Sequence, residues 1–508
     1  MADRADKSIV QPEVKVKFLR EGIEVEVSGG ALLSDVMRNA GVPLETPCNG
    51  MGVCGKCVVS VDERPVRACA HVLTQDVCVQ TPPPQGAFSS IDRGGHIGVE
   101  AGDASGAGVA VDLGTTGLSA CLVLKTGETV ARASCLNPQT QYGGDVLTRA
   151  SWCRGKPENL EKLRRSVVEA LNGLIDEMLA ASSIGRDSIR RVVVAGNTVM
   201  QHIFAGVDPT PLTCFPFRSV FEGAVDVSAP GFPSLGLDVA NARVCLLPCV
   251  SAFLGGDVVA GVLASGFAHE NGNSLFIDIG TNGEIVLRLD GKLYGTSTAA
   301  GPALEGMNIS CGVRAVPGAI ERVFTEFADG QEKIAFRTIG DAPPVGLCGS
   351  ALIDLTAVLL RKGVIDATGF LDCPDGKYRL ADNVFLSRKD IRQIQLAKGA
   401  IAAGIKTLLR AAGGRYETLD SIDIAGAFGF HLDFENLMTI GMIDREFRGT
   451  VRFVGNTSLE GARLCLPGKK IWDDATVIAR TIKPVELSES PDFQEAFIRE
   501  LGFPRCRT

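Results

Sequence analysis

The sequence lacks the features that would place the protein in a membrane, outside the cell or on a nucleic acid. Its first residues, MADRADKSIVQPEVKV, contain no apolar core of the kind found in a signal peptide. The most membrane-like window, residues 250–267, contains Asp257 and four glycines and is too polar for a span. Lysine and arginine form no long run, and the net charge is −8. We therefore expect a cytoplasmic protein that binds neither membrane nor nucleic acid.

Length and local composition divide the chain into three parts. A chain of 508 residues, with 45% hydrophobic and 22% charged residues, is long enough for several cores. Residues 12–84 show alternating strand patterns, and residues 106–508 combine strand and helix patterns. Residues 85–105 are rich in proline, glycine and serine and have no periodicity. We predict an N-terminal domain over 12–84, a flexible linker over 85–105 and a large α/β domain over 106–508.

Several elements follow from local patterns. VKVKFL and IEVEVS alternate with period two on either side of Glu21 and Gly22, which predicts a β-hairpin. ALLSDVMRNAG has helical spacing and stops at Gly41, and CVVSV and DVCVQT are predicted as short strands. Residues 158–181 and 388–414 have the spacing of two long helices in the large domain.

The stretch PCNGMGVCGKCVVSV, residues 47–61, sets three of the 16 cysteines apart from the others, most of which occur singly. Cys48, Cys54 and Cys57 have the spacing C-x5-C-x2-C, and Cys69 follows after eleven further residues. Glycines let such a loop curl so that its sulfurs meet at one centre, and the plant-type ferredoxin spacing is one residue shorter. We predict a [2Fe–2S] cluster held by Cys48, Cys54, Cys57 and Cys69. A zinc site and free cysteines are the alternatives, and Cys78 is the rival fourth ligand.

The large domain contains one internal repeat. Residues 108–124 (GVAVDLGTTGLSACLVL) and 274–289 (SLFIDIGTNGEIVLRL) share an apolar strand, D-x-G-T-x-G and a second apolar strand. Such a turn lets the backbone approach a phosphate closely, and an aspartate beside it is suited to holding Mg²⁺. Two unrelated turns are the alternative. We predict that Asp112 and Asp278 hold Mg²⁺ and act in catalysis, and that phosphates are cradled by Gly114, Thr115, Thr116, Gly280, Thr281, Asn282 and Gly283.

A third element and a further acid complete the predicted site. Residues 421–443 read as an apolar strand, the sequence AGAFG and a helix, so that Gly426 and Gly429 would pack against an adenosine. Asp257, in GGDVVAG, is a candidate catalytic acid, with helix capping as its alternative role. Asn197, in AGNTVM, is a candidate contact to the nucleotide or to the region between the two halves.

The two phosphate turns and the AGAFG segment resemble the motifs of actin, sugar kinases and heat-shock chaperone ATPases. Over residues 14–85 and 106–508 the chain resembles one family more closely, the ATP-dependent reductive activators of corrinoid proteins. The blocks that carry this resemblance are NPQTQYGGDVLTRA, VVVAGNTVMQHIFAG, FLGGDVVAG, FIDIGTNGEIVL, TAAGPALEGMNISCGVRAVPGAI, GLCGSALIDL and LAKGAIAAGI. The best-known member of that family, which activates the corrinoid iron–sulfur protein of acetogens, carries a middle domain between its ferredoxin and ATPase parts. In this chain only the linker occupies that place. We therefore expect a closer similarity to activators that serve methyltransferase systems.

The resemblance implies an α/β fold class: an N-terminal β-grasp, [2Fe–2S] ferredoxin-like domain followed by a duplicated actin-like, ribonuclease H-like ATPase fold. It implies an enzyme that binds a [2Fe–2S] cluster, ATP and Mg²⁺. The enzyme would pass one electron to a corrinoid protein and reduce Co(II) to Co(I) for a methyltransferase system. A low-potential electron donor is the implied second partner, and a homodimer is left open. Two other functions are considered: a small-molecule kinase with a regulatory iron–sulfur domain, and a non-catalytic iron–sulfur electron carrier.

Overall fold

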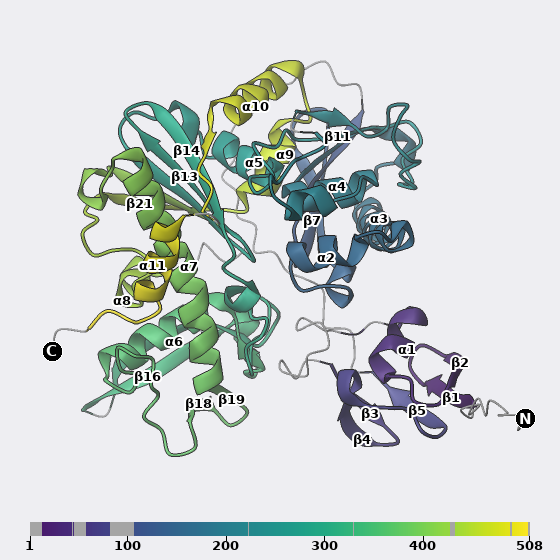
Figure 1. Ribbon diagram of the computed structural model, residues 1–508, viewed down its shortest axis with the longest axis horizontal. Helices are drawn as coiled ribbons and strands as arrows, with labels where there is room; N and C mark the ends of the chain where they lie inside the picture. The colour runs from purple at the N-terminus through teal and green to yellow at the C-terminus, as the bar shows by residue number, and fades with distance from the viewer. Residues whose placement is uncertain are drawn as a thin grey trace, which may run out of the picture. The chain divides into compact units, whose positions relative to one another are not determined.

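The computed structural model describes residues 13–42, 44, 57–81, 106–221, 223–328, 330–426, 432–487 and 490–505. The chain divides into two compact units, residues 1–86 with 140–144 and residues 87–139 with 145–508 (Figure 1). The predicted linker, 85–105, lies outside the described residues, so its boundaries stay a prediction. No helix in the described part of the chain combines the length and apolar character needed to cross a membrane.

The first unit is a five-stranded sheet with one helix packed on it. Its strand order is β2-β1-β5-β3-β4. Alternate side chains of β1, among them Val16 and Phe18, are buried against Leu33 and Met37 of the helix. The predicted hairpin, helix and strands of this unit are confirmed, with Gly22 at φ 67° in the turn. The elements are β1 (Glu13–Phe18), β2 (Ile23–Ser28), α1 (Leu33–Asn39), β3 (Val58–Val61), β4 (Arg64–Arg67), the 3₁₀ helix η1 (Ala68–Ala70) and β5 (Val77–Gln80).

The second unit contains two six-stranded sheets in which five successive strands match in order and direction, whereas the sixth strand is added at opposite edges, β10 beside β11 and β22 beside β14. The five matching strands confirm the internal repeat. The strand orders are β10-β11-β9-β6-β7-β8 and β21-β20-β12-β13-β14-β22. In each sheet an antiparallel hairpin, β6–β7 or β12–β13, lies beside a parallel strand, β9 or β20. The first sheet comprises β6 (Ala107–Leu113), β7 (Gly117–Val123), β8 (Thr129–Leu136), β9 (Ile189–Gly196), β10 (Val225–Asp226) and β11 (Arg243–Leu246). The second comprises β12 (Ser274–Ile279), β13 (Gly283–Leu289), β14 (Lys292–Thr298), β20 (Ser421–Ala425), β21 (Thr450–Gly455) and β22 (Lys483–Pro484).

Helices α5 (Gly256–Ala264) and α9 (Thr457–Leu464) lie between the two sheets, as Figure 1 shows. Their buried residues Val259 and Leu459 share one apolar cluster with Val193 of the first sheet and Phe276 of the second. At Gly461 of α9 an added Cβ would lie 2.3 Å from the carbonyl oxygen of Ala260, so only glycine permits this close crossing. This packing joins the two sheets and brings the ends of their hairpins to one pocket.

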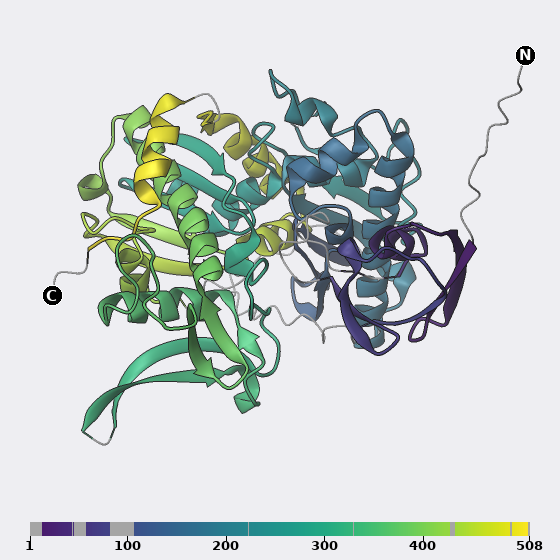
Figure 2. The same ribbon diagram turned by 60° about the horizontal axis from the view of Figure 1, so that its bottom comes forward.

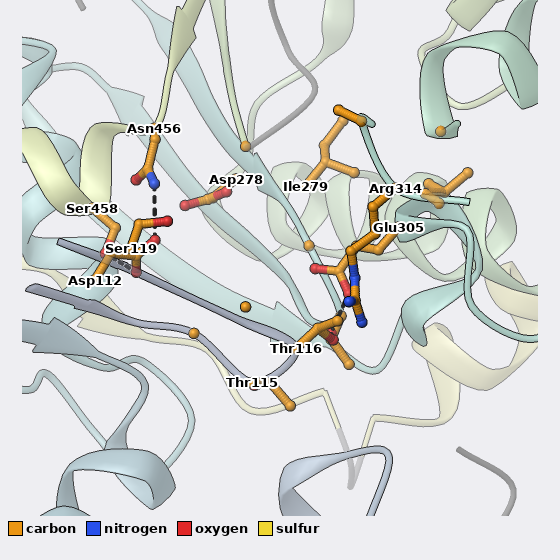
Figure 3. A pocket seen from close by; sticks show the side chains of 18 of the residues that line it. Asp112, Thr115, Thr116, Ser119, Asp278, Ile279, Glu305, Arg314, Asn456 and Ser458 are labelled. Atoms are coloured by element: carbon orange, nitrogen blue, oxygen red, sulfur yellow. Dashed lines mark hydrogen bonds between the residues drawn. The ribbon is translucent and has the colours of Figure 1, made fainter. Parts of the chain in front are cut away.

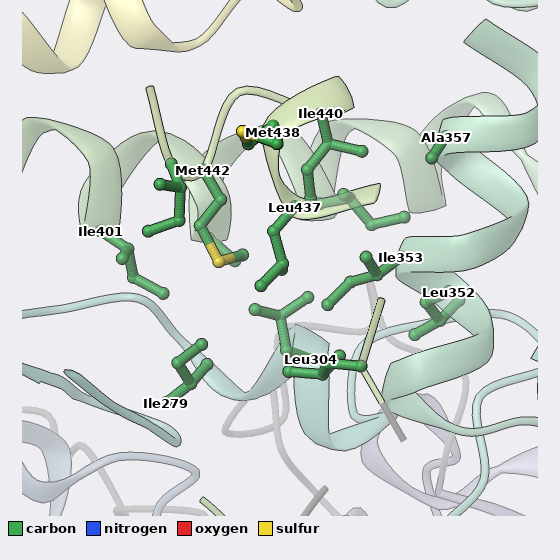
Figure 4. Close-up of a cluster of buried hydrophobic side chains, with 14 of the residues drawn as sticks. Ile279, Leu304, Leu352, Ile353, Ala357, Ile401, Leu437, Met438, Ile440 and Met442 are labelled. Carbon is green, nitrogen blue, oxygen red and sulfur yellow. The ribbon is translucent and has the colours of Figure 1, made fainter. Parts of the chain in front are cut away.

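The outer faces of the sheets are covered by the two predicted long helices, α3 (Pro157–Ala180) and α7 (Arg388–Ala412). Ser387 and Asp390 form a capping box at the start of α7, and Gly413 ends the helix at φ 78°. Under the second phosphate turn, Ile279 and Ile401 belong to a cluster with Leu437 (Figure 4).

The remaining elements of the second unit surround this framework. The β15–β16 hairpin extends away from the two sheets in Figure 2. Besides several short 3₁₀ helices, these elements are α2 (Val146–Cys153), α4 (Thr198–Ala205), the 3₁₀ helix η6 (Pro302–Glu305), β15 (Ala319–Ala328), β16 (Gln331–Thr338), β17 (Gly346–Leu347), α6 (Gly349–Arg361), β18 (Lys377–Ala381), β19 (Val384–Ser387), α8 (Phe434–Thr439), α10 (Lys469–Thr481) and α11 (Pro491–Glu500).

Candidate nucleotide site and cysteine pair

Two of the four predicted cluster cysteines are close together in the first unit. Cys57 directly precedes β3, Cys69 lies in η1, and their Sγ atoms are 3.2 Å apart. The backbone N–H of Ala68 donates to the carbonyl of Cys57, which fixes the two segments to each other. Both cysteines are buried, whereas Cys78 lies on β5 with its side chain exposed. The pair therefore fits two thiolate ligands of one centre. Cys48 and Cys54 lie outside the described residues, so the complete ligand set stays a prediction.

The second unit has a pocket where the two D-x-G-T-x-G turns meet (Figure 3). The first turn connects β6 to β7, and the second connects β12 to β13. Thr116 and Thr281 approach each other across the pocket, with their hydroxyl oxygens 2.8 Å apart, and Thr281 also donates to Glu305 at 2.7 Å. Asn197, the N-cap residue of α4, donates to the hydroxyl of Thr115 at 3.0 Å. The structure thus joins the two halves of the repeat through side chains of the turns themselves.

Most of the predicted nucleotide residues line this pocket. They are Asp112, Gly114, Thr115, Thr116, Asn197, Asp257, Asp278, Gly280, Thr281, Asn282 and Gly426. Gly283 does not line it, because it begins β13, where an added Cβ would meet Thr298 and Ile401. Close packing within the sheet is sufficient to require glycine there, and the contact of Gly283 with phosphate stays a prediction. Gly429 lies outside the described residues.

Carboxylates gather on one side of the pocket. Asp112 accepts hydrogen bonds from Asn456 at 2.9 Å and Ser458 at 2.7 Å, at the start of α9. Asp257 lies in the first turn of α5 and accepts from the backbone N–H of Val258 at 2.8 Å. Asn456 and Ser458 are 344 and 346 residues from Asp112 in the chain, which is why the sequence patterns did not bring these two residues to the predicted site.

Glu284 is a pocket carboxylate that sequence reasoning missed. It lies on β13 directly opposite Asp278 of β12 in the antiparallel register, so the two side chains share one face of the sheet. In the first hairpin, Ser119 occupies the position opposite Asp112. The GTNGE sequence contained this signal, because a tight hairpin places the residue after its last glycine across from the aspartate.

Burial chiefly, and the proximity of the carboxylates to one another, raises their pKa values. Burial, with smaller contributions from Asp257, Asp112 and Glu305, raises the pKa of Asp278 to about 8. Burial chiefly, with Asp112 nearby, raises the pKa of Asp257 to about 7. The pKa of Glu284 is also raised, mainly by burial and then by Asp257 and Asp278. A cation placed among these groups would reverse the effect, because it favours their charged forms.

These pKa shifts predict how stability depends on pH. A carboxyl group whose folded-state pKa is raised stabilises the fold below its unfolded pKa of about 3.9. That contribution is lost as the pH rises through the folded-state pKa, which is about 8 for Asp278. We expect the Tm of the nucleotide-free protein, measured calorimetrically without divalent cations, to fall between pH 5 and pH 8.5. Asp278→Asn should flatten this dependence. If the Tm fell equally steeply with pH in the wild-type protein and in Asp278→Asn, the raised pKa of Asp278 would not be the cause of the pH dependence.

The described residues contain no group of three or more histidine, cysteine, aspartate or glutamate side chains placed to hold a metal ion by themselves. Mg²⁺ that is bound together with a nucleotide requires only one or two protein carboxylates, because phosphates and water supply the other oxygens. Asp112 and Asp278 both line the pocket with carboxylate oxygens. Their chemistry therefore fits Mg²⁺ that arrives with phosphates rather than a permanent metal site.

Gly114 offers a direct test of the first turn. An added Cβ at Gly114 would lie 2.5 Å from the carbonyl oxygen of Gly117, so the turn must change shape to accept it. We expect Gly114→Ala to weaken ATP binding about tenfold, equivalent to about 1.4 kcal/mol, when measured by isothermal titration calorimetry. Gly173→Ala, on α3 with open space around the added carbon, is the matched control and should bind ATP normally. Normal binding by Gly114→Ala would show that this turn does not contact the phosphates.

Three sequence families match the chain in succession. Residues 16–79 match the 2Fe-2S iron-sulfur cluster binding domain. Residues 107–270 match the RACo middle region, and residues 272–508 match the C-terminal domain of RACo, the ASKHA domain. The match over 107–270 corrects one expectation from the sequence, namely that the chain lacks the middle region. That region corresponds to the part of the chain carrying the first sheet and the first D-x-G-T-x-G turn. The expected combination of a ferredoxin-like domain with an actin-like domain is confirmed.

Named relatives are similar over most of the chain. The corrinoid activation enzyme RamQ of Eubacterium limosum is 32% identical over 78% of this chain and 70% of its own length. The [Co(II) methylated amine-specific corrinoid protein] reductase of Methanosarcina barkeri is 28% identical over 78% of this chain and 77% of its own length. A solved structure, the reductive activator for corrinoid, iron-sulfur protein, is 28% identical. It superposes with a TM-score of 0.72, covering 97% of this chain and 99% of that chain.

Proposed function

The chain belongs to the family of reductive activators of corrinoid proteins, and we propose that it reduces the cobalt of a corrinoid protein from Co(II) to Co(I), coupled to ATP hydrolysis. The corrinoid protein would serve a methyltransferase system, and a low-potential electron donor would supply the electron. The single observation that carries the proposal is the convergence of two phosphate turns and a carboxylate cluster on one pocket, in a chain that also buries a cysteine pair.

The first unit would take the electron from the donor. Cys57 and Cys69 hold their sulfurs 3.2 Å apart, and Cys48 and Cys54 would complete the ligand set. A [2Fe–2S] cluster, when bound, accepts and releases one electron at a time. The apolar core around Val59, Leu73 and Val79 keeps water from the buried cysteine pair, and such burial is one of the factors that set a cluster's potential.

The second unit would supply the energy that the electron transfer needs. For a one-electron step, each 59 mV of unfavourable potential difference lowers the equilibrium constant about tenfold. ATP hydrolysis in the pocket can compensate only if the protein changes conformation with the nucleotide. Thr116 and Thr281 lie on opposite sides of the pocket and contact each other, so phosphates placed between them must alter this contact. We propose that this alteration moves the two halves of the second unit and is transmitted to the bound corrinoid protein.

Residues of the pocket divide into three roles. Asp112 and Asp278 would hold Mg²⁺, which, when bound, neutralises charge on the phosphates. Asp257 and Glu284 flank them and would orient water near the terminal phosphate. Asn456 and Ser458 fix the carboxylate of Asp112 by donating to both of its oxygens.

ATP turnover with and without a partner tests this proposal against two alternatives. We expect phosphate release by the purified protein to rise when a Co(II) corrinoid protein of a methyltransferase system is added. Turnover stimulated by a small polyol or acid, independent of any corrinoid protein, would instead indicate a small-molecule kinase. Nucleotide binding without turnover under any of these conditions would indicate an electron carrier.

A further inference from the structure

Hydrogen bonds to three successive backbone carbonyls fix the conformation of the first phosphate turn. The carbonyl of Gly114 accepts from the side-chain amide of Asn137 at 2.8 Å. The carbonyl of Thr115 accepts from Nη2 of Arg149 at 2.6 Å, and the carbonyl of Thr116 accepts from the backbone N–H of Asn137 at 2.9 Å. All three donors come from the segment between residues 137 and 149, which sequence reasoning had assigned no role.

These hydrogen bonds to the carbonyls also determine the direction in which the N–H groups of the turn point. In a trans peptide the C=O and N–H groups point in opposite directions. Because the carbonyls of Gly114 and Thr115 point back to Asn137 and Arg149, the N–H groups of Thr115 and Thr116 point the other way. Both threonines line the pocket, so two successive amides are presented to it. Successive amides of this kind form an anion-binding concavity.

Arg149 is buried completely, with 0% of its surface exposed. Its Nη1 donates to Oε1 of Gln139 at 3.1 Å and contacts the sulfur of Met200 at 3.2 Å. Gln139 is itself fixed, because its side-chain amide donates to the carbonyl of Leu163 at 2.9 Å. Burial lowers the pKa of Arg149 to about 9, which leaves the guanidinium protonated at neutral pH.

Acidic side chains outnumber basic ones in the lining of the pocket, and Arg149 adds a positive charge close to it. The lining includes one arginine, Arg314, and a larger set of carboxylates: Asp112, Asp257, Asp278, Glu284, Glu305 and Glu321. Those of the carboxylates that are ionised repel a polyphosphate, and nearby cations offset this repulsion. A charge in the interior acts over longer distances than one in water, because the effective dielectric constant is lower.

We propose that Arg149 is a positioning residue for phosphate binding, which acts through the Thr115–Thr116 peptide rather than by touching the nucleotide. It orients the amide of Thr116 toward the pocket and adds positive charge behind the turn. The inference rests on the proposed nucleotide-binding function and concerns one part of it, the recognition of phosphates as opposed to adenosine.

The test compares ligands that differ only in phosphate number. ATP, ADP, AMP and adenosine are titrated into the full-length wild-type protein, Arg149→Met and Arg149→Lys by isothermal titration calorimetry. Arg149→Met is expected to lose at least about tenfold in affinity for ATP and ADP and less than about twofold for adenosine. Arg149→Lys keeps the charge but not the planar fork, so its ATP affinity should lie between those of the other two proteins.

The control is Lys398→Met, which removes another fully buried cation, on α7 beside Gly502 and away from the pocket. It should lower the Tm without changing the ratio of ATP to adenosine affinity. If Arg149→Met does not fold, Gln139→Met, which removes the acceptor that orients the guanidinium, provides the same comparison. Equal losses for ATP and adenosine, or no loss for ATP, would overturn the inference. Failure of the wild-type protein to bind any nucleotide would instead refute the proposed function.

Discussion

Asp278→Asn is expected to lose at least about 100-fold in ATP turnover, equivalent to about 2.7 kcal/mol of transition-state stabilisation. The substitution keeps the size of the side chain but removes the charge that would hold Mg²⁺ near the phosphates. Asp112→Asn should have a similar effect, because Asp112 lies at the corresponding position of the other half of the repeat. Phosphate release in the presence of the corrinoid partner measures the loss.

Asp423→Asn is the matched control for this experiment. Asp423 is a buried carboxylate on β20, the strand beside β12, and accepts from Arg452 at 2.6 Å without lining the pocket. Its replacement should lower the Tm but leave the turnover of the folded protein unchanged. Wild-type turnover in Asp278→Asn, or an equal loss in Asp423→Asn, would be incompatible with a specific role for Asp278. Both variants should keep the visible absorption of the cluster, since the first unit has its own core.

Cys69→Ser is expected to remove most of the iron from the protein. A [2Fe–2S] cluster contains two irons and requires four ligands, and a serine hydroxyl is a poor substitute for a thiolate. Cys69 lies beside Cys57 in the interior, so no other described cysteine of the first unit can take its place without rearrangement. Iron analysis and the electron paramagnetic resonance signal of the reduced protein measure the loss.

Cys78→Ser is the matched control, because Cys78 belongs to the same unit but is exposed on strand β5. It should keep about two irons per chain and the signal of the wild-type protein. If Cys78→Ser lost the cluster and Cys69→Ser retained it, the ligand assignment would be wrong. ATP turnover should survive in Cys69→Ser, since the nucleotide pocket lies in the second unit.

Much of the fold could be predicted from the sequence because its determinants are local. The period-two pattern of residues 13–18 and the capped, periodic stretch of α7 each specify an element without reference to the rest of the chain. The internal repeat could also be detected, because both hairpins retain an aspartate, glycines and apolar strands. The matching order of five strands in the two sheets follows from that repeat, whereas the sixth strands, β10 and β22, do not correspond to each other.

The parts of the site that escaped prediction depend on contacts between distant segments. Nothing in the sequence around Arg149 distinguishes a buried arginine that backs a turn from a solvated one on a helix surface. Asn456 and Ser458 follow β21 and lie at the start of α9, and the packing of α9 against β6 and α5 brings them to Asp112. The D-x-G-T-x-G pattern predicts that Gly283 contacts phosphate, whereas the structure places this glycine beside Thr298 and not in the lining of the pocket. Local sequence predicts which turns exist, whereas packing decides which of their residues reach the pocket.

The most direct test of the account is the formation of Co(I) by the purified protein. A Co(II) corrinoid protein, a low-potential reductant and ATP are mixed without oxygen, and the absorbance of Co(I) is followed over time. We expect Co(I) to form with the wild-type protein and ATP, and to fail to form when ATP is omitted or when Asp278→Asn replaces the wild-type protein. Full reduction by Asp278→Asn without ATP hydrolysis would contradict the claim that the nucleotide pocket drives the electron transfer.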